Sequence, residues 1–125
     1  MKILTKDQII LLHEHLISEF GGSSGIRDEG LLESAINSPL QSFDGIDFYP
    51  TIIDKSVRLG FGLIKNHPFI DGNKRIGTPA ILTQLALNGI FFNYDDNELI
   101  ETIMEVAAGV LSHQSLHLWV TGHIQ

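Results

Sequence analysis

The sequence predicts an all-α protein, a compact helical bundle with a small flap or hairpin before its central pair of helices. Three observations support this fold class. Apolar residues recur three and four positions apart along most of the 125 residues. Helix caps and stop signals interrupt that pattern at short intervals. The 43% of hydrophobic residues can fill a core, while only 18% are charged, which argues against disorder. We therefore expect one domain spanning residues 1–125.

Two helices are expected before residue 40. Thr5 and Gln8 form a capping box, and the helix after them ends at Gly21-Gly22. Asp28 caps a second, shorter helix that ends at Ser38-Pro39. Their apolar positions are Ile9, Leu12, Leu16 and Phe20 in the first, and Leu31, Leu32, Ala35 and Ile36 in the second.

The segment from residue 40 to residue 50 lacks the helical pattern. Its turn dipeptide Asp44-Gly45 lies among Phe43, Ile46 and Phe48, which predicts a small hairpin or flap. Thr51 then caps a third helix that runs to about Asn66.

The start of the fourth helix has two interpretations. It begins near Asn73 with Pro79 in its interior, which kinks it, or it begins at Thr78-Pro79 as a cap followed by proline. Asn88-Gly89 ends this helix in either case. Two further helices are expected after a short extended piece at residues 90–92, starting at Asp96 or Asn97 (through Gly109) and at Ser112 or Ser115.

Composition excludes several classes of function. There is no cysteine, so thiolate catalysis, disulfides and cysteine zinc sites are ruled out. The net charge of −7 argues against a broad nucleic-acid interface, which needs a basic face. No run approaches the ~20 apolar residues of a membrane span, and no targeting segment is visible. A cytoplasmic protein without direct nucleic-acid or membrane contact is the expectation.

Residues 67–75, HPFIDGNKR, differ from an ordinary connection between helices. If a helix begins at Asn73, Lys74 and Arg75 lie in its first turn, where positive charge opposes the helix dipole. A bound anion removes this conflict, because free backbone N–H groups and both cations would hold it. Gly72 permits the close backbone approach that such an anion site requires.

The same stretch carries groups suited to phosphate transfer. His67 can take a proton near neutral pH, and Asp71 is a hard oxygen ligand suited to Mg²⁺. Asn73 can orient a phosphate oxygen or the loop itself, and Phe69 is expected to anchor the loop in the core. Base, metal ligand and anion site together predict a phosphate-transfer centre.

This nonapeptide resembles the Fic/Doc signature H-x-F-x-(D/E)-G-N-(G/K)-R at every fixed position. It is most similar to the Doc (death-on-curing) branch, because Lys74 and Thr78 stand where AMP-transferring Fic enzymes have glycine and arginine. Residues 22–35, the flap region and the helix leading into the motif also look Doc-like.

The resemblance implies roles for these positions. His67 would deprotonate a hydroxyl of a target protein, Asp71 would hold Mg²⁺ on a nucleotide, and four residues would bind the nucleotide phosphates, namely Gly72, Asn73, Lys74 and Arg75. The Doc branch implies a kinase that transfers the γ-phosphate of ATP to a threonine or serine, with elongation factor Tu as the family's target and translation arrest as the result. The flap with Phe43, Ile46 and Phe48 would dock the target segment in extended form.

Partners and alternatives follow from the same resemblance. Self-inhibiting Fic proteins carry an (S/T)-x-x-x-E-(G/N) helix, and Glu29-Gly30 has Gly25 where the hydroxyl residue should be. Restraint by a separate antitoxin protein is therefore expected. Two alternatives remain open: transfer of AMP to a protein hydroxyl, or a catalytically lapsed Fic fold that acts as a binding module.

The remaining histidines give no metal site by spacing. His13 and His15 lie two apart and face different sides of a helix. His113 and His117 share a face but lack a neighbouring carboxylate pattern. Arg27 and Asp28 are either a structural pair typical of the family or a contact near the nucleotide, and the structural interpretation is favoured.

Overall fold

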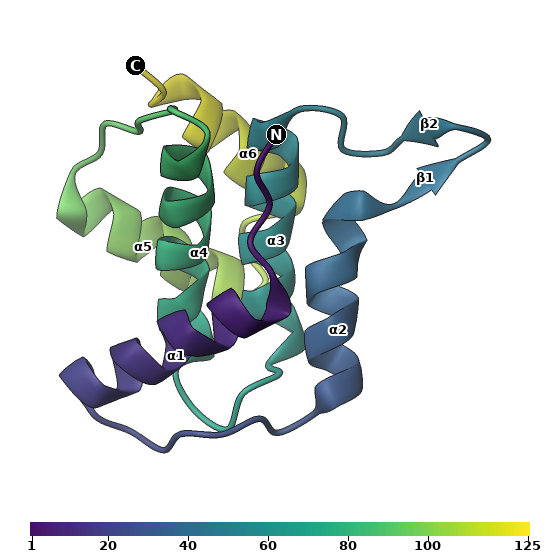
Figure 1. Ribbon diagram of the computed structural model, residues 1–125. Coiled ribbons are helices and arrows are strands. Elements are labelled where there is room, and N and C mark those ends of the chain that lie inside the picture. The colour runs from purple at the N-terminus through teal and green to yellow at the C-terminus, as the bar shows by residue number, and fades with distance from the viewer.

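The computed structural model describes residues 1–125 and confirms a helical fold with a small two-stranded hairpin (Figure 1). The elements in chain order are α1 (Lys6–Phe20), α2 (Glu29–Asn37), a 3-10 turn (Ser38–Leu40), β1 (Ser42–Phe43), β2 (Ile46–Asp47), α3 (Ile52–Asn66), α4 (Asn73–Leu87), α5 (Asp96–Ala107) and α6 (His113–Gly122). No helix is both long enough and apolar enough to serve as a membrane span.

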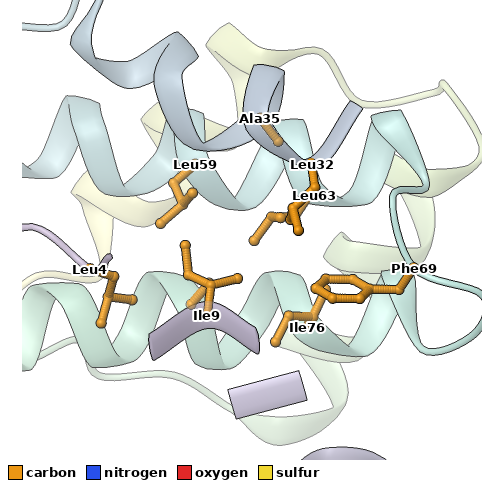
Figure 2. Packing of buried hydrophobic residues seen from close by; sticks show 9 residues of the cluster. Leu4, Ile9, Leu32, Ala35, Leu59, Leu63, Phe69 and Ile76 are labelled. Atoms are coloured by element: carbon orange, nitrogen blue, oxygen red, sulfur yellow. The ribbon is translucent and has the colours of Figure 1, made fainter. Parts of the chain in front are cut away.

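Helices α3 and α4 are the centre of the fold, because both contribute to each of its two cores. One core lies where α1 and α2 pack against this pair. Figure 2 shows its side chains converging from α1, α2, α3 and α4, together with Leu4 and Phe69. The other core lies where α5 and α6 pack against the same pair. The loop between α3 and α4 therefore emerges from the most heavily packed part of the molecule.

Two glycines let α3 and α4 approach closely. A Cβ atom built on Gly77 would lie 2.5 Å from Ile64 Cδ1, and one on Gly60 would overlap the side chain of Ile81. The same Cβ on Gly60 would lie 3.0 Å from the carbonyl oxygen of Gly77, so backbone faces backbone at the crossing. Any larger residue at either position has to push the central helices apart.

Local capping chemistry explains the helix starts. Thr5 and Thr51 complete capping boxes, and the side chain of Asp28 accepts a hydrogen bond from the backbone of Leu31. Asp95 and Ser112 cap α5 and α6 in the same way, so α5 begins at Asp96 and α6 at His113. The expected end of α5 at Gly109 is wrong by two residues, because the last two form a turn with Gly109 at φ 79°.

Helix α4 begins at Asn73 and continues through Pro79, so the alternative start at Thr78-Pro79 is wrong. Gly72 precedes it in the left-handed conformation, with φ 77° and ψ 18°. Pro79 lacks the N–H that would bond to the carbonyl of Arg75, four residues earlier. The helix tolerates this lost bond because its buried side chains hold it on both sides of the proline, among them Ile76 and Ala80.

The predicted hairpin forms at residues 42–47. Asp44 and Gly45 both have positive φ, 53° and 77°, which suits the tight turn between β1 and β2. Figure 1 shows the hairpin projecting from the body of the protein, before the start of α3. Phe43 and Ile46 are 74% and 71% exposed, so the hairpin has an apolar surface in contact with water.

A half-buried histidine lies at the contact between α6 and α3. His113 packs edge-on against Tyr49 and Phe61, with ring centroids 5.5 Å apart in both pairs. Its Nε2 atom is buried without a hydrogen-bond partner. Burial, followed by the charges of Arg58 and His117, lowers the pKa of the His113 imidazole below its usual 6.5.

We expect His113→Phe to stabilise the fold, and to do so more strongly in mild acid. Because the folded-state pKa lies below the unfolded one, the unfolded chain binds protons more readily, and stability is lost as the pH falls below 6.5. Phenylalanine keeps the aromatic contacts and removes a buried polar atom whose desolvation costs about 1–3 kcal/mol. Urea unfolding at about pH 8 and about pH 5.5 checks this. The same pH dependence in both proteins would contradict it.

Candidate active site

His67 ends α3 in an unusual backbone conformation. It has φ 49° and ψ 52°, a left-handed geometry that is uncommon for residues other than glycine. Arg27 supports this turn, since its Nε donates to the carbonyl of His67 at 2.7 Å and its Nη2 to that of Asn66 at 3.1 Å. A guanidinium at a helix C-terminus also interacts favourably with the helix dipole. Arg27 is thus a structural residue, as the sequence suggested, and its role is to cap α3.

The connection between α1 and α2 is fastened to the loop by its backbone. The N–H groups of Arg27 and Asp28 both donate to the carbonyl of Pro68, at 2.7 and 3.0 Å. The N–H of Ile70 donates to Gly25 at 3.0 Å, and Ile26 and Phe69 pair in an antiparallel bridge. The loop is therefore anchored by main-chain bonds to a segment some forty positions earlier in the chain.

Phe69 and Asn73 hold the loop from inside. The Phe69 side chain is 1% exposed and belongs to the core that Figure 2 shows. The Asn73 side chain, 7% exposed, accepts from the N–H of Phe69 at 2.9 Å and donates to its carbonyl at 3.0 Å. Of the two roles open for Asn73, the contacts are those of a residue that orients the loop. Its Nδ2 also lies 3.5 Å from Nδ1 of His67.

The carboxylate of Asp71 is exposed and already oriented by backbone groups. Its Oδ1 accepts from the N–H of Gly72 at 2.8 Å, and its Oδ2 accepts from the N–H of Ser23 at 3.3 Å. A Cβ on Gly22 would lie 2.6 Å from Oδ2, so the α1–α2 connection passes directly beside this oxygen. Sequence reasoning assigned no role to Ser23, whose contribution comes from its backbone.

Lys74 and Arg75 are exposed in the first turn of α4, where no acidic residue lies. No carboxylate lies within salt-bridge distance of either cation, and the guanidinium of Arg75 rests over the ring of Phe20, 5.4 Å from its centroid. Four of the other helices have acidic residues in their first turn. Helix α6 also lacks an acid there, but the side chain of Ser112 caps it, whereas α4 has no side-chain cap. The N-terminus of α4 is thus suited to an external anion.

An open groove of about 1400 Å³ brings these groups together. Its walls are α1, the motif loop, the first half of α4, and α5, and its lining includes His67, Asp71, Lys74 and Arg75. Its apolar lining comes from both sides, with Leu12, Leu16 and Phe20 from α1 and Leu99, Ile100, Ile103 and Met104 from α5. Small-molecule sites usually measure about 300–1000 Å³, so the groove has room for a nucleotide and part of a second ligand.

The flap residues lie elsewhere. Phe43, Ile46 and Phe48 do not line the groove. Figure 1 shows the hairpin joined to the start of α3, whereas the motif loop follows the end of that helix. Helix α3 has 15 residues and is about 22 Å long, so its start, near the hairpin, and its end, at the motif loop, are roughly that far apart. A docking role for the flap stays a prediction.

The donor set fits one hard cation that takes most of its ligands from a substrate. Asp71 is the only carboxylate that the motif loop contributes, and no group of three potential metal ligands exists in the protein. Mg²⁺ is commonly held by one or two carboxylates together with water and substrate phosphates. Asp71, in a groove that it shares with the unpaired cations Lys74 and Arg75, meets that description.

His13 also contributes to the site, and the sequence did not predict this. It is 1% exposed, and its ring is stacked on Phe69 with centroids 3.8 Å apart. Its Nε2 lies 2.7 Å from the carbonyl oxygen of Asp71. The available signal was its place four residues after Ile9 and three before Leu16, which puts a polar ring on the buried stripe of α1.

Comparison with known proteins finds three similarities. The family model described as the Fic/DOC family matches residues 3–85, which include the whole motif loop. "Toxin Doc" of Mycolicibacterium smegmatis is 39% identical over 90 residues, covering 71% of this chain and 69% of that protein. "Protein kinase doc" of Escherichia phage P1 is 28% identical over 116 residues, covering 93% of this chain and 90% of that protein.

Proposed function

The chain belongs to the Fic/DOC family, and from this membership we propose that it is a Doc-like toxin that acts as a protein kinase. Its substrates would be ATP and a threonine or serine hydroxyl on a protein of the translation machinery, with elongation factor Tu as the first candidate. One observation carries the proposal. A single groove is lined by an exposed histidine, an oriented carboxylate and two cations without a carboxylate partner.

The reaction assigns a task to each of these groups. The hydroxyl oxygen of the target forms a bond to the γ-phosphorus, and the bond from that phosphorus to the β–γ bridging oxygen breaks, so that ADP leaves. An imidazole nitrogen of His67 takes the hydroxyl proton. Lys74 and Arg75 hold phosphate oxygens at the N-terminus of α4, assisted by backbone N–H groups and the helix dipole.

Mg²⁺ is the cofactor we propose, with Asp71 as its protein ligand. When bound, it would offset the negative charge of the nucleotide phosphates. The orientation of the Asp71 carboxylate by Gly72 and Ser23 is available before any ligand arrives. The remaining ligands would be phosphate oxygens and water, which suits a motif loop that contributes one carboxylate.

An antitoxin is the second proposed partner, and it would act by covering the groove. Phe20, Ile70, Ile100 and Met104 line the groove and are each at least half exposed. A protein segment that fills the groove and buries these side chains would also cover His67, which lines the same groove. The relative named "Toxin Doc" supports a toxin–antitoxin pair for this chain.

Two labels on ATP test which group is transferred. We expect γ-³²P label to appear on the translation factor after incubation with this protein and magnesium, and α-³²P label to stay on the released nucleotide. Transfer from the α-phosphate instead would show the alternative, AMP transfer. Intact mass of the product distinguishes the two independently, since phosphate adds about 80 daltons and AMP about 329.

Lys74→Gly is expected to weaken nucleotide binding by about 10- to 100-fold, because it removes one charge-assisted hydrogen bond to phosphate, worth about 1.5–3 kcal/mol. Calorimetric titration with ATP and magnesium measures this. Lys65→Gly is the matched control, since Lys65 is an exposed lysine in the last turn of α3 that does not line the groove. Equal affinities of wild type and Lys74→Gly would remove Lys74 from the phosphate site.

A further inference from the structure

His13 contacts the peptide group that precedes α4. A carbonyl oxygen can only accept, so the 2.7 Å contact with Asp71 means that Nε2 of His13 carries a proton and donates it. The imidazole is stacked on Phe69 almost in parallel, with 6° between the ring planes. A Cβ on Gly72 would lie 3.4 Å from the same Nε2, so the ring lies directly against this turn.

The peptide group between Asp71 and Gly72 carries two hydrogen bonds at opposite ends. Its carbonyl accepts from His13, and its N–H donates to Oδ1 of the Asp71 carboxylate at 2.8 Å. Because a peptide group is planar, fixing the direction of its C=O also fixes the direction of its N–H. Rotation of this plane would break both bonds together. His13 therefore acts on the carboxylate through one rigid unit.

Packing alone does not explain a histidine at this position. A side chain that is 1% exposed on the apolar stripe of α1 is normally hydrophobic, and burying a polar ring costs free energy unless it has a partner. The partner of Nε2 is the carbonyl of Asp71, from a segment 58 positions later. The cost of the buried ring is thus offset only when the loop has the conformation described.

We propose that His13 is a positioning residue for the metal-binding carboxylate. By holding the Asp71–Gly72 peptide plane, it keeps Oδ1 of Asp71 on the N–H of Gly72 and leaves the carboxylate in one orientation toward the groove. This inference rests on the proposed function, in which Asp71 binds Mg²⁺ on a nucleotide. Groups that orient metal ligands in this way typically change metal affinity or activity by 10–100-fold when removed.

The test uses two replacements of His13 that separate its donor from its ring. His13→Phe keeps an aromatic ring against Phe69 but has no donor, whereas His13→Gln keeps an N–H at a similar reach. We expect the magnesium concentration needed for half-maximal ATP binding to rise at least about tenfold in His13→Phe and to stay within about threefold of wild type in His13→Gln.

A second readout needs no metal or nucleotide. In the free protein, amide exchange at Gly72 is expected to accelerate in His13→Phe and to remain slow in His13→Gln, because the N–H loses its fixed direction only in the former. Should His13→Phe fail to fold, His13→Asn replaces it in both measurements, since its amide is one methylene shorter than that of glutamine and cannot reach Asp71.

The control is Asn88→Ala, at the other end of α4. Asn88 exchanges two hydrogen bonds with the backbone of Lys2 and also donates to Gln84, so its loss weakens a comparable set of bonds outside the groove. Magnesium dependence unchanged in His13→Phe, or raised equally in Asn88→Ala, would overturn the positioning role. Absence of ATP binding in the wild type would instead refute the proposed function itself.

Discussion

His67→Ala is expected to lower the rate of phosphate transfer by at least about 100-fold, and to abolish growth arrest when the protein is produced without an antitoxin. The reason is the loss of the proton acceptor, since general-base catalysis typically contributes about 10²–10⁴-fold. His67 is exposed in the groove, so its removal leaves no cavity in either core. Transfer of γ-³²P label and colony counts after induction measure the two effects.

The left-handed backbone of His67 makes a second variant necessary, because alanine could disturb the turn as well as remove the imidazole. His67 has φ 49°, a conformation that costs alanine more than asparagine. His67→Asn therefore removes the imidazole while preserving the turn, and we expect it to be as inactive as His67→Ala. His117→Ala is the histidine control, because His117 pairs with Asp54 away from the groove. Activity in His67→Asn close to that of wild type would end the assignment of His67 as the base.

Gly77→Ala is expected to cause a large loss of stability, about 3 kcal/mol or more. The added methyl group would lie 2.5 Å from Ile64 Cδ1, a side chain that is fully buried, so the central helices must separate or Ile64 must leave its position. Overpacking of a core typically costs about 1–3 kcal/mol and more where the backbone has to move. Urea unfolding followed by circular dichroism gives the free energy of unfolding.

Gly122→Ala is the matched control for this substitution. Gly122 is also helical, but a Cβ there meets nothing within 4 Å. Alanine is the better helix former, so we expect a neutral or slightly stabilising change of at most about 1 kcal/mol. An unfolding free energy for Gly77→Ala within about 0.5 kcal/mol of wild type would mean that α3 and α4 do not pack as closely as described.

Local signals in the sequence were sufficient to predict that each helix exists and where most of them begin. Thr5, Asp28 and Thr51 start their helices where expected, because a cap acts on N–H groups within three residues of itself. Pro79 was harder to interpret. A proline in a helix interior destabilises that helix by about 3 kcal/mol when local interactions alone are considered. Only the structure, in which Ile76 and Ala80 are buried on either side of Pro79, shows that α4 continues through it.

The residues of the candidate site also fall into two groups: those that the sequence motif identifies and those that only the tertiary structure reveals. The motif identified His67, Asp71, Lys74 and Arg75, which the structure places around one groove. Their supports could not be found by spacing, since His13 and Arg27 reach the loop across 58 and 40 positions of the chain. The position of the flap also depends on tertiary structure, because the length and direction of α3 separate it from the loop.

The motif loop is held by hydrogen bonds to residues far away in the sequence, and this affects the order in which the protein folds. Contacts between residues far apart in sequence form after local ones, since closing a longer stretch of chain costs more entropy. The helices can therefore form early, while the bonds from Arg27 to His67 and from His13 to Asp71 close late. A nascent chain on the ribosome would carry every reactive group of the motif without its working arrangement. The arrangement of these groups around one groove would arise only with the final docking of the N-terminal helices.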